Sequence, residues 1–356
     1  MSNELILGSV RIKSDDFRFF EKKKDNLWKA VSELDSRILE VLELYSENDN
    51  LDLLIDSKDD LFLRGSLSPN PEASVCGARV MVLPNGDKLA RAGFSLFAKD
   101  LKFNFDDEEK LWDVCYTNAS GLKTYLYTEN KVHLEQDKKL RLVDKFEEYY
   151  LTILETCEKK IKSTSCGVVD LALYIMLNTY IRVGNIEYFH RFNHKGLTTL
   201  QKKDVVIASN ILTFSYTGKD GVPQITSKKF PGFFITKFEK LIEDKSSEDF
   251  IFTNKNGNCI HSDDFSKFLF NLTGEHFYPH IIRSHYADMT CRDFLKTHRA
   301  ATHEEVDAVF MKIAENLGHK KYNKKTDTWD VNFAVTLKNY IHPIYSERMI
   351  NLYKSN

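Results

Sequence analysis

The sequence lacks the patterns that mark several classes of protein. Its six cysteines are scattered without a C-x-x-C pair, which argues against finger-type zinc sites and is typical of reduced thiols in an intracellular protein. No stretch near the start combines basic residues, an apolar run and a small-residue cleavage site, so we expect no secretory leader. The most apolar segment, residues 167–183, is interrupted by Asp170, Asn178 and Arg182. We therefore predict a buried helix there, no membrane span and no metal site.

Internal repeats, low-complexity tracts and a strong net charge are also missing. The formal net charge is −2, but the two parts of the chain differ in sign. Residues 1–130 carry about −7 and residues 131–356 about +5. A basic second part is what a phosphate-binding region would produce, and chance scatter of surface charge is the alternative. The length of 356 residues favours two domains.

Periodicity in the first part of the chain predicts helices followed by strands. Residues 14–46 carry apolar side chains at helical spacing and contain neither Gly nor Pro, so we expect residues 1–60 to form a helical extension. Residues 61–136 contain alternating, aromatic runs, two of them flanking Asn85-Gly86. Because Asn-Gly between such runs favours a hairpin, this segment predicts a small, mainly antiparallel β domain.

From residue 137 onward helical patterns dominate. Residues 137–356 predict a mainly α-helical domain, interrupted at 205–230 by alternating residues that turn at Gly218 and Gly221. The chain as a whole is therefore expected to be an α+β protein, with a short antiparallel sheet inside the helical domain.

Arg182 comes directly after the apolar segment 166–181, and Gly184 can end that helix as a C-cap. A guanidinium does not lose its charge, so an arginine at the end of a buried helix needs an anionic partner. The stretch "HKGLTTLQKKDV" (194–205) follows, and a loop of solvated lysines is the bland interpretation of it. The alternative is that its side chains meet phosphate oxygens, through Lys195, Thr198, Thr199 and Lys202.

Further positions toward the end of the chain suit the same chemistry. Lys219 lies on a glycine-bounded hairpin, where an ammonium can act as a proton donor. His280 and Arg283 are one helical turn apart and can face two oxygens of one phosphate. His319 follows a helix-ending glycine, and Tyr340 could act as a nucleophile where cations stabilise its phenolate. Each residue alone is more often structural, and only the ordered set points to a site.

That ordered set resembles the type IB DNA topoisomerases, especially the compact poxvirus and bacterial forms. "YIRVGNIEYFHRFNHKGLTTLQKKDVVI" is similar to a long block of that family, and "FSYTGKDG" is similar to its lysine hairpin. "NLGH" and "NYIHP" match two further segments, and "SGLKTYLYTENKVHL" (120–134) looks like the strand that ends the family's N-terminal domain. The resemblance covers roughly residues 115–356.

The resemblance implies the topoisomerase IB and tyrosine recombinase catalytic fold, and the roles of five residues. Tyr340 would attack a phosphodiester of duplex DNA and form a 3′-phosphotyrosyl link. Arg182, Arg283 and His319 would bind the non-bridging oxygens, and Lys219 would protonate the leaving 5′ oxygen. The nicked duplex would rotate and be resealed by a monomer, without ATP, metal or cofactor. Lys123, Tyr125, Tyr127 and His280 would add DNA contacts.

Three departures from the family keep alternatives open. The H-x-x-R form at His280 is what site-specific tyrosine recombinases carry, so a recombinase is the second hypothesis and a non-enzymatic DNA-binding relic the third. "KKYNKKTDTWDV" is inserted before Tyr340 and resembles an exposed linker, which leaves Tyr322 and Tyr345 as less favoured nucleophiles. Thr124 replaces a glutamine of the family, so contacts to base edges from that strand are not expected.

Overall fold

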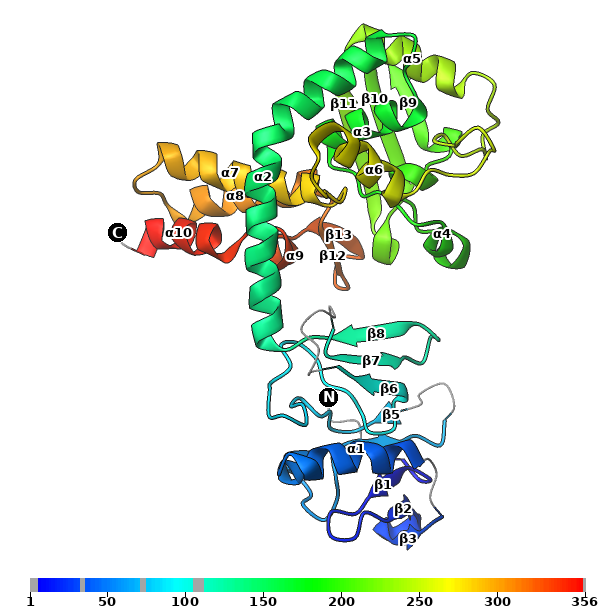
Figure 1. The fold of residues 1–356 in the computed structure, drawn as a ribbon, viewed down its shortest axis with the longest axis vertical. Helices are drawn as coiled ribbons and strands as arrows, with labels where there is room; N and C mark the ends of the chain where they lie inside the picture. The colour runs from blue at the N-terminus through cyan, green and yellow to red at the C-terminus, as the bar shows by residue number, and fades with distance from the viewer. Residues whose placement is uncertain (1–5, 33–35, 71–74, 105–111, 355–356) are drawn as a thin grey trace. The chain divides into compact units, whose positions relative to one another are not determined.

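The computed structural model describes residues 6–32, 36–70, 75–104 and 112–354. The chain divides into two compact units, Met1–Asp137 and Lys138–Asn356, each with buried apolar clusters of its own. Strands and helices occur in both, so the protein is of the α+β class (Figure 1).

The first unit is built from two antiparallel sheets and one longer helix, α1 (Ser36–Glu47). The strand order of the larger sheet is β3-β2-β1-β4-β5, and that of the smaller sheet is β6-β7-β8. The strands are β1 (Val10–Ile12), β2 (Phe19–Lys22), β3 (Trp28–Ala30), β4 (Ser66–Leu67), β5 (Val75–Cys76), β6 (Lys99–Phe103), β7 (Val114–Thr117) and β8 (Lys123–Leu126).

The predicted helical extension is wrong for most of its length. Helix α1 is present, with Ile38, Val41, Leu42 and Tyr45 buried at helical spacing, but three strands precede it. Leu27, counted as part of the helical pattern, is 65% exposed at the entrance to β3. Aromatic residues that pack across strands decide the local structure here, because they favour a pleated surface over a helix. Residues of β1 and α1 share one core with residues beyond position 60, so the first sixty residues are not a separate extension.

The hairpin turn predicted at Asn85-Gly86 is confirmed. Leu83 and Asp87 are joined by a 2.8 Å backbone hydrogen bond, and Gly86 takes a left-handed φ of 89° that favours glycine. Next to this turn, the two flanking runs of the described chain pair through the isolated β-bridge between Val82 and Lys88 and form no longer ladder there.

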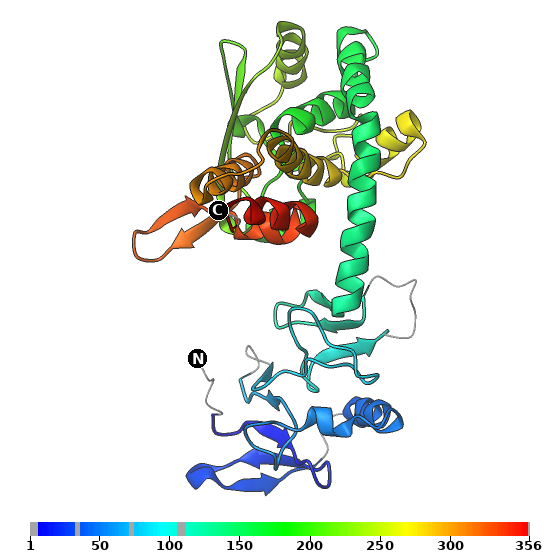
Figure 2. The same cartoon turned by 90° about the vertical axis from the view of Figure 1, so that its left-hand side faces the viewer.

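The second unit is mainly helical, as the sequence predicts, and contains a three-stranded antiparallel sheet in the order β11-β10-β9. Its strands are β9 (Val205–Ala208), β10 (Ile211–Thr217), β11 (Pro223–Lys229), and a hairpin of β12 (Lys320–Asn323) and β13 (Thr328–Val331). Helix α2 (Glu129–Lys162) enters it, and the others are α3 (Val168–Thr179), α4 (Ile186–Phe192), α5 (Gly232–Ile242), α6 (Ser262–Thr273), α7 (Ile281–Thr297), α8 (His303–Asn316), α9 (Ala334–Asn339) and α10 (Pro343–Lys354) (Figures 1 and 2).

Helix α3 is the buried helix of the second unit, but it ends earlier than predicted. Tyr180 caps it in the left-handed conformation, and Arg182 lies beyond it in an irregular segment. Gly184 serves another purpose, because a Cβ on Gly196 would lie only 2.5 Å from the Cα of Gly184. The two backbones therefore meet directly. Leu197 and Thr198 donate backbone hydrogen bonds of 2.7 Å to the carbonyls of Arg182 and Val183 and hold this segment in place.

Replacing Gly196 with alanine should destabilise the second unit, because its Cβ would overlap the backbone of Gly184. We expect the free energy of unfolding to fall by roughly 1–3 kcal/mol, the range for overpacking. Urea unfolding followed by circular dichroism measures this. Gly232→Ala is the control, since no atom lies within 4 Å of its added Cβ. Equal stability of the two variants would contradict the role of the glycine contact.

Candidate functional site

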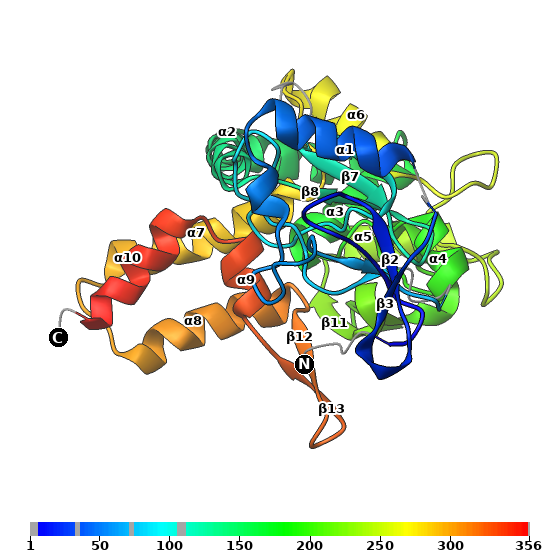
Figure 3. The same cartoon turned by 90° about the horizontal axis from the view of Figure 1, so that it is seen from below.

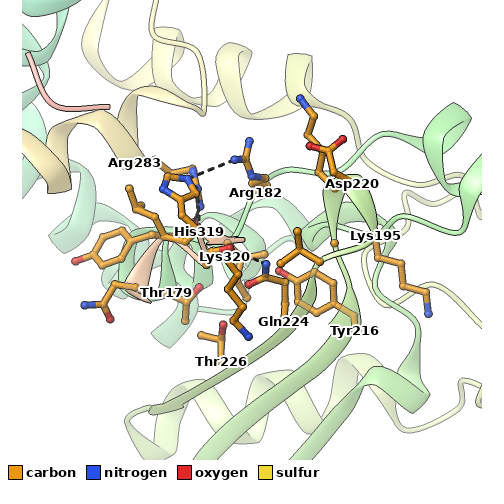
Figure 4. Close-up of a pocket in the computed structure, with 18 of the residues that line it drawn as sticks. Thr179, Arg182, Lys195, Tyr216, Asp220, Gln224, Thr226, Arg283, His319 and Lys320 are labelled. Atoms are coloured by element: carbon orange, nitrogen blue, oxygen red, sulfur yellow. Dashed lines mark hydrogen bonds between the residues drawn. The ribbon is translucent and has the colours of Figure 1, made fainter. Parts of the chain in front are cut away.

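Four of the five predicted catalytic side chains line one cavity of about 100 Å³ in the second unit. They reach it from the segment after α3, the turn after β10, the first turn of α7 and the residue after Gly318: Arg182, Lys219, Arg283 and His319. Figure 4 shows Arg182 and Arg283 directed toward His319. The ends of helices and strands thus bring together residues that are far apart in the sequence.

Arg283 is the most firmly fixed of these groups. It is 3% exposed, and its guanidinium donates to the carbonyl oxygens of Tyr180 and of Leu317, the latter at 2.8 Å. Its Nε is buried and has no hydrogen-bond partner in the described part of the chain. Burial lowers the pKa of Arg283 to about 10, so the group remains cationic at neutral pH.

His319 lies between the two arginines and is held from behind. Its Nε2 is 3.2 Å from a guanidinium nitrogen of Arg283 and 3.4 Å from one of Arg182, while its Nδ1 is 2.8 Å from Oγ1 of Thr336. A guanidinium only donates, so we assign the proton to Nδ1, which donates to Thr336. Burial, followed by the two guanidiniums, lowers the pKa of His319 to about 3. The imidazole is therefore neutral and accepts hydrogen bonds from both arginines.

Arg182 and Arg283 lack an acidic partner in the part of the chain that the structure describes, since no ion pair includes either residue. Two guanidiniums that converge on one neutral imidazole create a concentrated positive potential. Their donors point to the same side, which is the arrangement expected of a site for an oxyanion such as phosphate.

Lys219 is placed at the edge of this cavity by the turn that the sequence predicts. Gly218 donates a 2.7 Å backbone hydrogen bond to Val222, and Asp220 takes a left-handed φ of 61° between β10 and β11. The side chain of Lys219 is exposed and lines the cavity with Arg182 and His319. Its ammonium can therefore approach a group bound beside the two arginines.

Tyr340 lies behind the imidazole rather than in the cavity lining. It is 3% exposed, and its ring is 4.6 Å from that of His319 and 5.1 Å from the guanidinium carbon of Arg283. Its hydroxyl is 3.1 Å from Nε2 of His280, whose ring stacks on it at 5.0 Å. His280 is open to solvent as a residue, but desolvation of its ring and then the charge of Arg283 lower its pKa to about 3. A neutral His280 can accept the proton of the tyrosine.

The other two candidate tyrosines lie in different surroundings. Tyr322 is 42% exposed on the β12–β13 hairpin, and its hydroxyl donates to Asp327. Tyr345 is on α10, where the guanidinium of Arg292 lies 4.7 Å above its ring. Of the three, Tyr340 is the one in contact with both arginines and both histidines.

Three residues that the sequence did not suggest hold Tyr340 and His319 in place. Lys139, on α2, donates to the carbonyl of Asn339 at 2.6 Å and lies 5.5 Å from the Tyr340 ring centre. Asp288, on α7, accepts the backbone N–H of His342 at 2.8 Å. Burial raises the pKa of Asp288 to about 7 and lowers that of Lys139. Together with Thr336 they come from distant parts of the chain, so no local pattern could have found them.

Comparison with known proteins places this constellation in a family. Residues 129–344, well over half of the chain, match the family described as eukaryotic DNA topoisomerase I, catalytic core. The chain belongs to this family.

The curated relatives of this family member are poxvirus proteins. It is 25% identical over 154 residues to DNA topoisomerase 1B of vaccinia virus (strain Copenhagen), a match that covers 40% of this chain and 49% of the relative. DNA topoisomerase I of monkeypox virus is 24% identical over the same shares. The chain thus spans about half the length of the curated relatives it matches.

A solved structure was also found for comparison. The site-specific recombinase XerH, in a pre-cleavage complex with its difH substrate, aligns with 18% identity and a TM-score of 0.32. The alignment covers 47% of this chain and 46% of that one. Separately, no helix in the described ranges has the length and apolar character needed to cross a bilayer.

The groups of the "GLTTL" region that the sequence predicts to bind phosphate have partners within the protein instead. Lys195 lines the cavity but is only 8% exposed, and its ammonium is held by both carboxylate oxygens of Asp204, each at 2.8 Å (Figure 4). Thr198 and Thr199 are buried, and their hydroxyls donate to the backbone carbonyls of Val183 and Gly196.

Lys202 is occupied in the same way. Its ammonium donates to the carbonyls of Glu243 and Lys245, just beyond α5. The whole loop therefore positions Arg182 from behind, because its polar groups are consumed in holding the loop together. These lysines and threonines are of types suited to phosphate, but their observed partners lie within the protein.

The residues predicted to meet DNA from the first unit of this family member share one face of the small sheet. Along β8 and just past it, Lys123, Tyr125 and Tyr127 are exposed and alternate with the partly or fully buried Thr124 and Leu126. Cross-strand pairing puts Lys99 and Lys102 of β6 on that same face. This arrangement is compatible with a backbone-binding surface, and the DNA contact itself stays a prediction.

Lowering the pH should destabilise the protein through His319. Its pKa is lower in the folded state than its usual value of 6.5, so the unfolded chain binds the proton more readily between about 6.5 and 3. Stability is therefore lost as the pH falls through this window, by about 1.4 kcal/mol per unit.

Urea unfolding at pH 7 and at lower pH measures this loss. His319→Gln should reduce it without abolishing it, because His280 contributes with the same sign. His190→Gln, an exposed residue on α4, is the matched control. An unchanged pH dependence in His319→Gln would show that the imidazole is not held neutral.

Proposed function

We propose that this chain is a type IB DNA topoisomerase that relaxes supercoiled duplex DNA through a covalent bond between Tyr340 and the 3′ end of a cleaved strand. One observation carries the proposal. The guanidiniums of Arg182 and Arg283 converge on His319 with no carboxylate partner among the described residues, and the ring of Tyr340 is against all three. Family membership supports the same assignment.

The cavity between the arginines suits the scissile phosphate. The non-bridging oxygens would accept hydrogen bonds from Arg182 and Arg283, which now point at His319. As negative charge grows on these oxygens in the transition state, fixed guanidiniums stabilise it without having to reorganise. The anchoring of Arg283 to two backbone carbonyls provides that rigidity.

His319 changes its role when the phosphate binds. In the free protein its Nε2 accepts from two arginines, so it cannot donate. Once a phosphate lies against the two guanidiniums, an anion faces Nε2, and this neighbouring charge raises the pKa of His319. A proton on Nε2 then donates to a non-bridging oxygen. DNA binding should accordingly take up a proton at this residue.

In the cleavage step one bond forms, one bond breaks and two protons are transferred. The oxygen of Tyr340 forms a bond to phosphorus as the bond from phosphorus to the 5′ oxygen breaks. The phenolic proton passes to Nε2 of His280, 3.1 Å away, and Lys219 gives a proton to the leaving 5′ oxygen. His280, expected from the sequence to bind DNA, is better placed as the base that accepts the phenolic proton.

Resealing is the reverse of cleavage. The phosphotyrosyl bond retains the energy of the phosphodiester, so the step as written consumes no ATP. While the strand is open, the duplex rotates about the intact strand, and the 5′ hydroxyl then attacks the phosphotyrosine. The exposed face of β8, with Lys123, Tyr125 and Tyr127, would hold the duplex backbone during this cycle, with one copy of the chain acting on the DNA.

A second function rests on one feature. His280 precedes Arg283 by three residues, the H-x-x-R form that is expected of site-specific tyrosine recombinases. Such an enzyme would cleave a defined sequence with the same residues and would exchange strands between two duplexes. Relaxation of plasmids that lack any such sequence separates the two functions.

Tyr340→Phe should abolish relaxation of supercoiled plasmid in EDTA without ATP, because the attacking oxygen is gone. It should also abolish the covalent protein–DNA adduct trapped by detergent, while DNA binding persists. Tyr345→Phe is the matched control and should keep activity. Adduct formation by Tyr340→Phe would place the nucleophile elsewhere.

Lys219→Ala should slow cleavage by about 10²–10⁴-fold, the usual contribution of a general acid. A substrate in which sulfur replaces the bridging 5′ oxygen should restore the rate, since a thiolate leaves without a proton. His280→Ala should slow cleavage of both substrates to a similar extent, because the base acts on Tyr340. Single-turnover cleavage of the two substrates measures this, and equal rescue of both variants would remove the distinction between acid and base.

A further inference from the structure

Residues 320–331 form a β-hairpin and not the exposed linker that their sequence resembles. Strands β12 and β13 pair at four positions, from Lys320 with Val331 to Asn323 with Thr328. A 3.0 Å hydrogen bond from Asn332 to the carbonyl of His319 closes its base. Figures 2 and 3 show the hairpin projecting from the helices of its own unit.

The hairpin carries unpaired positive charge. Lys321, Lys324 and Lys325 are exposed, and none forms an ion pair with any carboxylate that the structure describes. The two acidic residues of the hairpin are used internally. Asp327 accepts from Tyr322, and Asp330 accepts from Asn323 and Thr328, both at 3.0 Å. Its lysines are therefore available to an external anion.

One face of the hairpin is continuous with the catalytic cavity. Side chains alternate along a strand, so Lys320 and Tyr322 share a face, and Lys320 lines the cavity. On that face Tyr322 pairs with Trp329, with ring centroids 5.4 Å apart, and Tyr322 remains 42% exposed. An exposed aromatic pair beside a phosphate site can pack against the sugars of a bound backbone.

The reach of the hairpin matches the backbone of a duplex. At about 3.3 Å per residue, Lys324 is roughly 13 Å from Lys320 along β12 and the turn. That distance corresponds to about four base-pair steps of 3.4 Å. A strand whose scissile phosphate lies between Arg182 and Arg283 could thus present further phosphates to the tip.

We propose that the β12–β13 hairpin is a second DNA-binding arm that binds backbone phosphates beside the scissile one. Lys324 and Lys325, in its turn, and Lys321, on the strand face opposite Tyr322, make these contacts. This inference rests on the proposed function, because it requires duplex DNA in the cavity. Its partner is the phosphate backbone, so the contact is independent of base sequence. A two-stranded hairpin has little stability by itself. The hydrogen bond from Asn332 to the carbonyl of His319 connects the base of this hairpin to a residue of the site.

Removing the three charges should weaken the salt dependence of DNA binding. Lys321→Gln, Lys324→Gln and Lys325→Gln are combined in a Tyr340→Phe background, which prevents cleavage. Each lost phosphate contact should reduce the slope of log K against log salt by about 0.9, so a fall of roughly 2–3 is expected. The control removes three exposed lysines elsewhere in the second unit, Lys240, Lys255 and Lys267. An equal slope in both triple variants would overturn the proposal.

Trp329 gives a direct readout of contact. The chain has three tryptophans, so Trp28→Phe with Trp112→Phe leaves Trp329 as the only one. Binding of a long duplex should protect Trp329 from iodide quenching, and a duplex that ends at the scissile phosphate should not. If neither duplex protects Trp329, the hairpin does not bind DNA, and its exposed aromatic face would instead suit a protein partner. If the double substitution lowers the unfolding midpoint, the salt slope decides alone.

The two proposals fail in different ways. If wild-type protein forms no covalent adduct that depends on Tyr340, the proposed function fails before the hairpin is tested. If the adduct forms and the salt slope is unchanged by the three substitutions, only the hairpin proposal is wrong.

Discussion

The sharing of one neutral imidazole by two guanidiniums is the interaction on which the second unit depends. Like charges repel, and burial of Arg283 adds a desolvation cost, so this arrangement persists only if the surrounding structure enforces it. The enforcement comes from backbone carbonyls at Tyr180 and Leu317 and from Thr336 behind His319. The two carbonyls lie at the ends of α3 and α8, where helices leave carbonyls without partners, and Thr336 contributes its hydroxyl from α9.

The loop after Arg182 extends the same support outward. The close approach of Gly184 and Gly196 lets two backbone segments lie side by side, and the buried pair of Lys195 with Asp204 fixes the loop behind them. On the opposite side of the cavity, Gln224 of β11 donates to the carbonyl of Gly318 at 2.8 Å and ties the lysine hairpin to the residue before His319. These backbone contacts hold in place the segments whose side chains line the cavity.

The sequence predicts the features that depend on neighbouring residues, and it does not predict contacts between residues that are far apart in the chain. The α+β class, the buried helix and the hairpin of Lys219 follow from periodicity and glycine placement, and all are present. The first strands were missed because Leu27 and its neighbours happened to repeat at helical spacing in a segment that aromatic packing makes extended. Lys139 and Asp288 could not be foreseen, because their contacts with the residues around Tyr340 exist only in the folded unit.

The phosphate ligands assigned to the "GLTTL" loop show the limit of reasoning from residue type. A lysine beside two threonines is equally suited to an anion from outside and to the carbonyls and carboxylates of its own loop. Asp204, nine residues beyond Lys195, binds the ammonium of Lys195, and this contact exists only in the folded loop. Motif residues that position a catalytic arginine can therefore look, in sequence, like the ligands themselves.

The burial of Tyr340 has a chemical consequence under the proposed function. With 3% of its surface exposed, the residue is shielded from water by His280, His319 and the ring-facing cations. Under the proposed function, a phosphotyrosyl ester formed there would be exposed mainly to the tethered DNA hydroxyl. Hydrolysis of that ester would leave a permanent nick in the DNA. The packing that holds Tyr340 in place therefore also favours resealing of the cleaved strand.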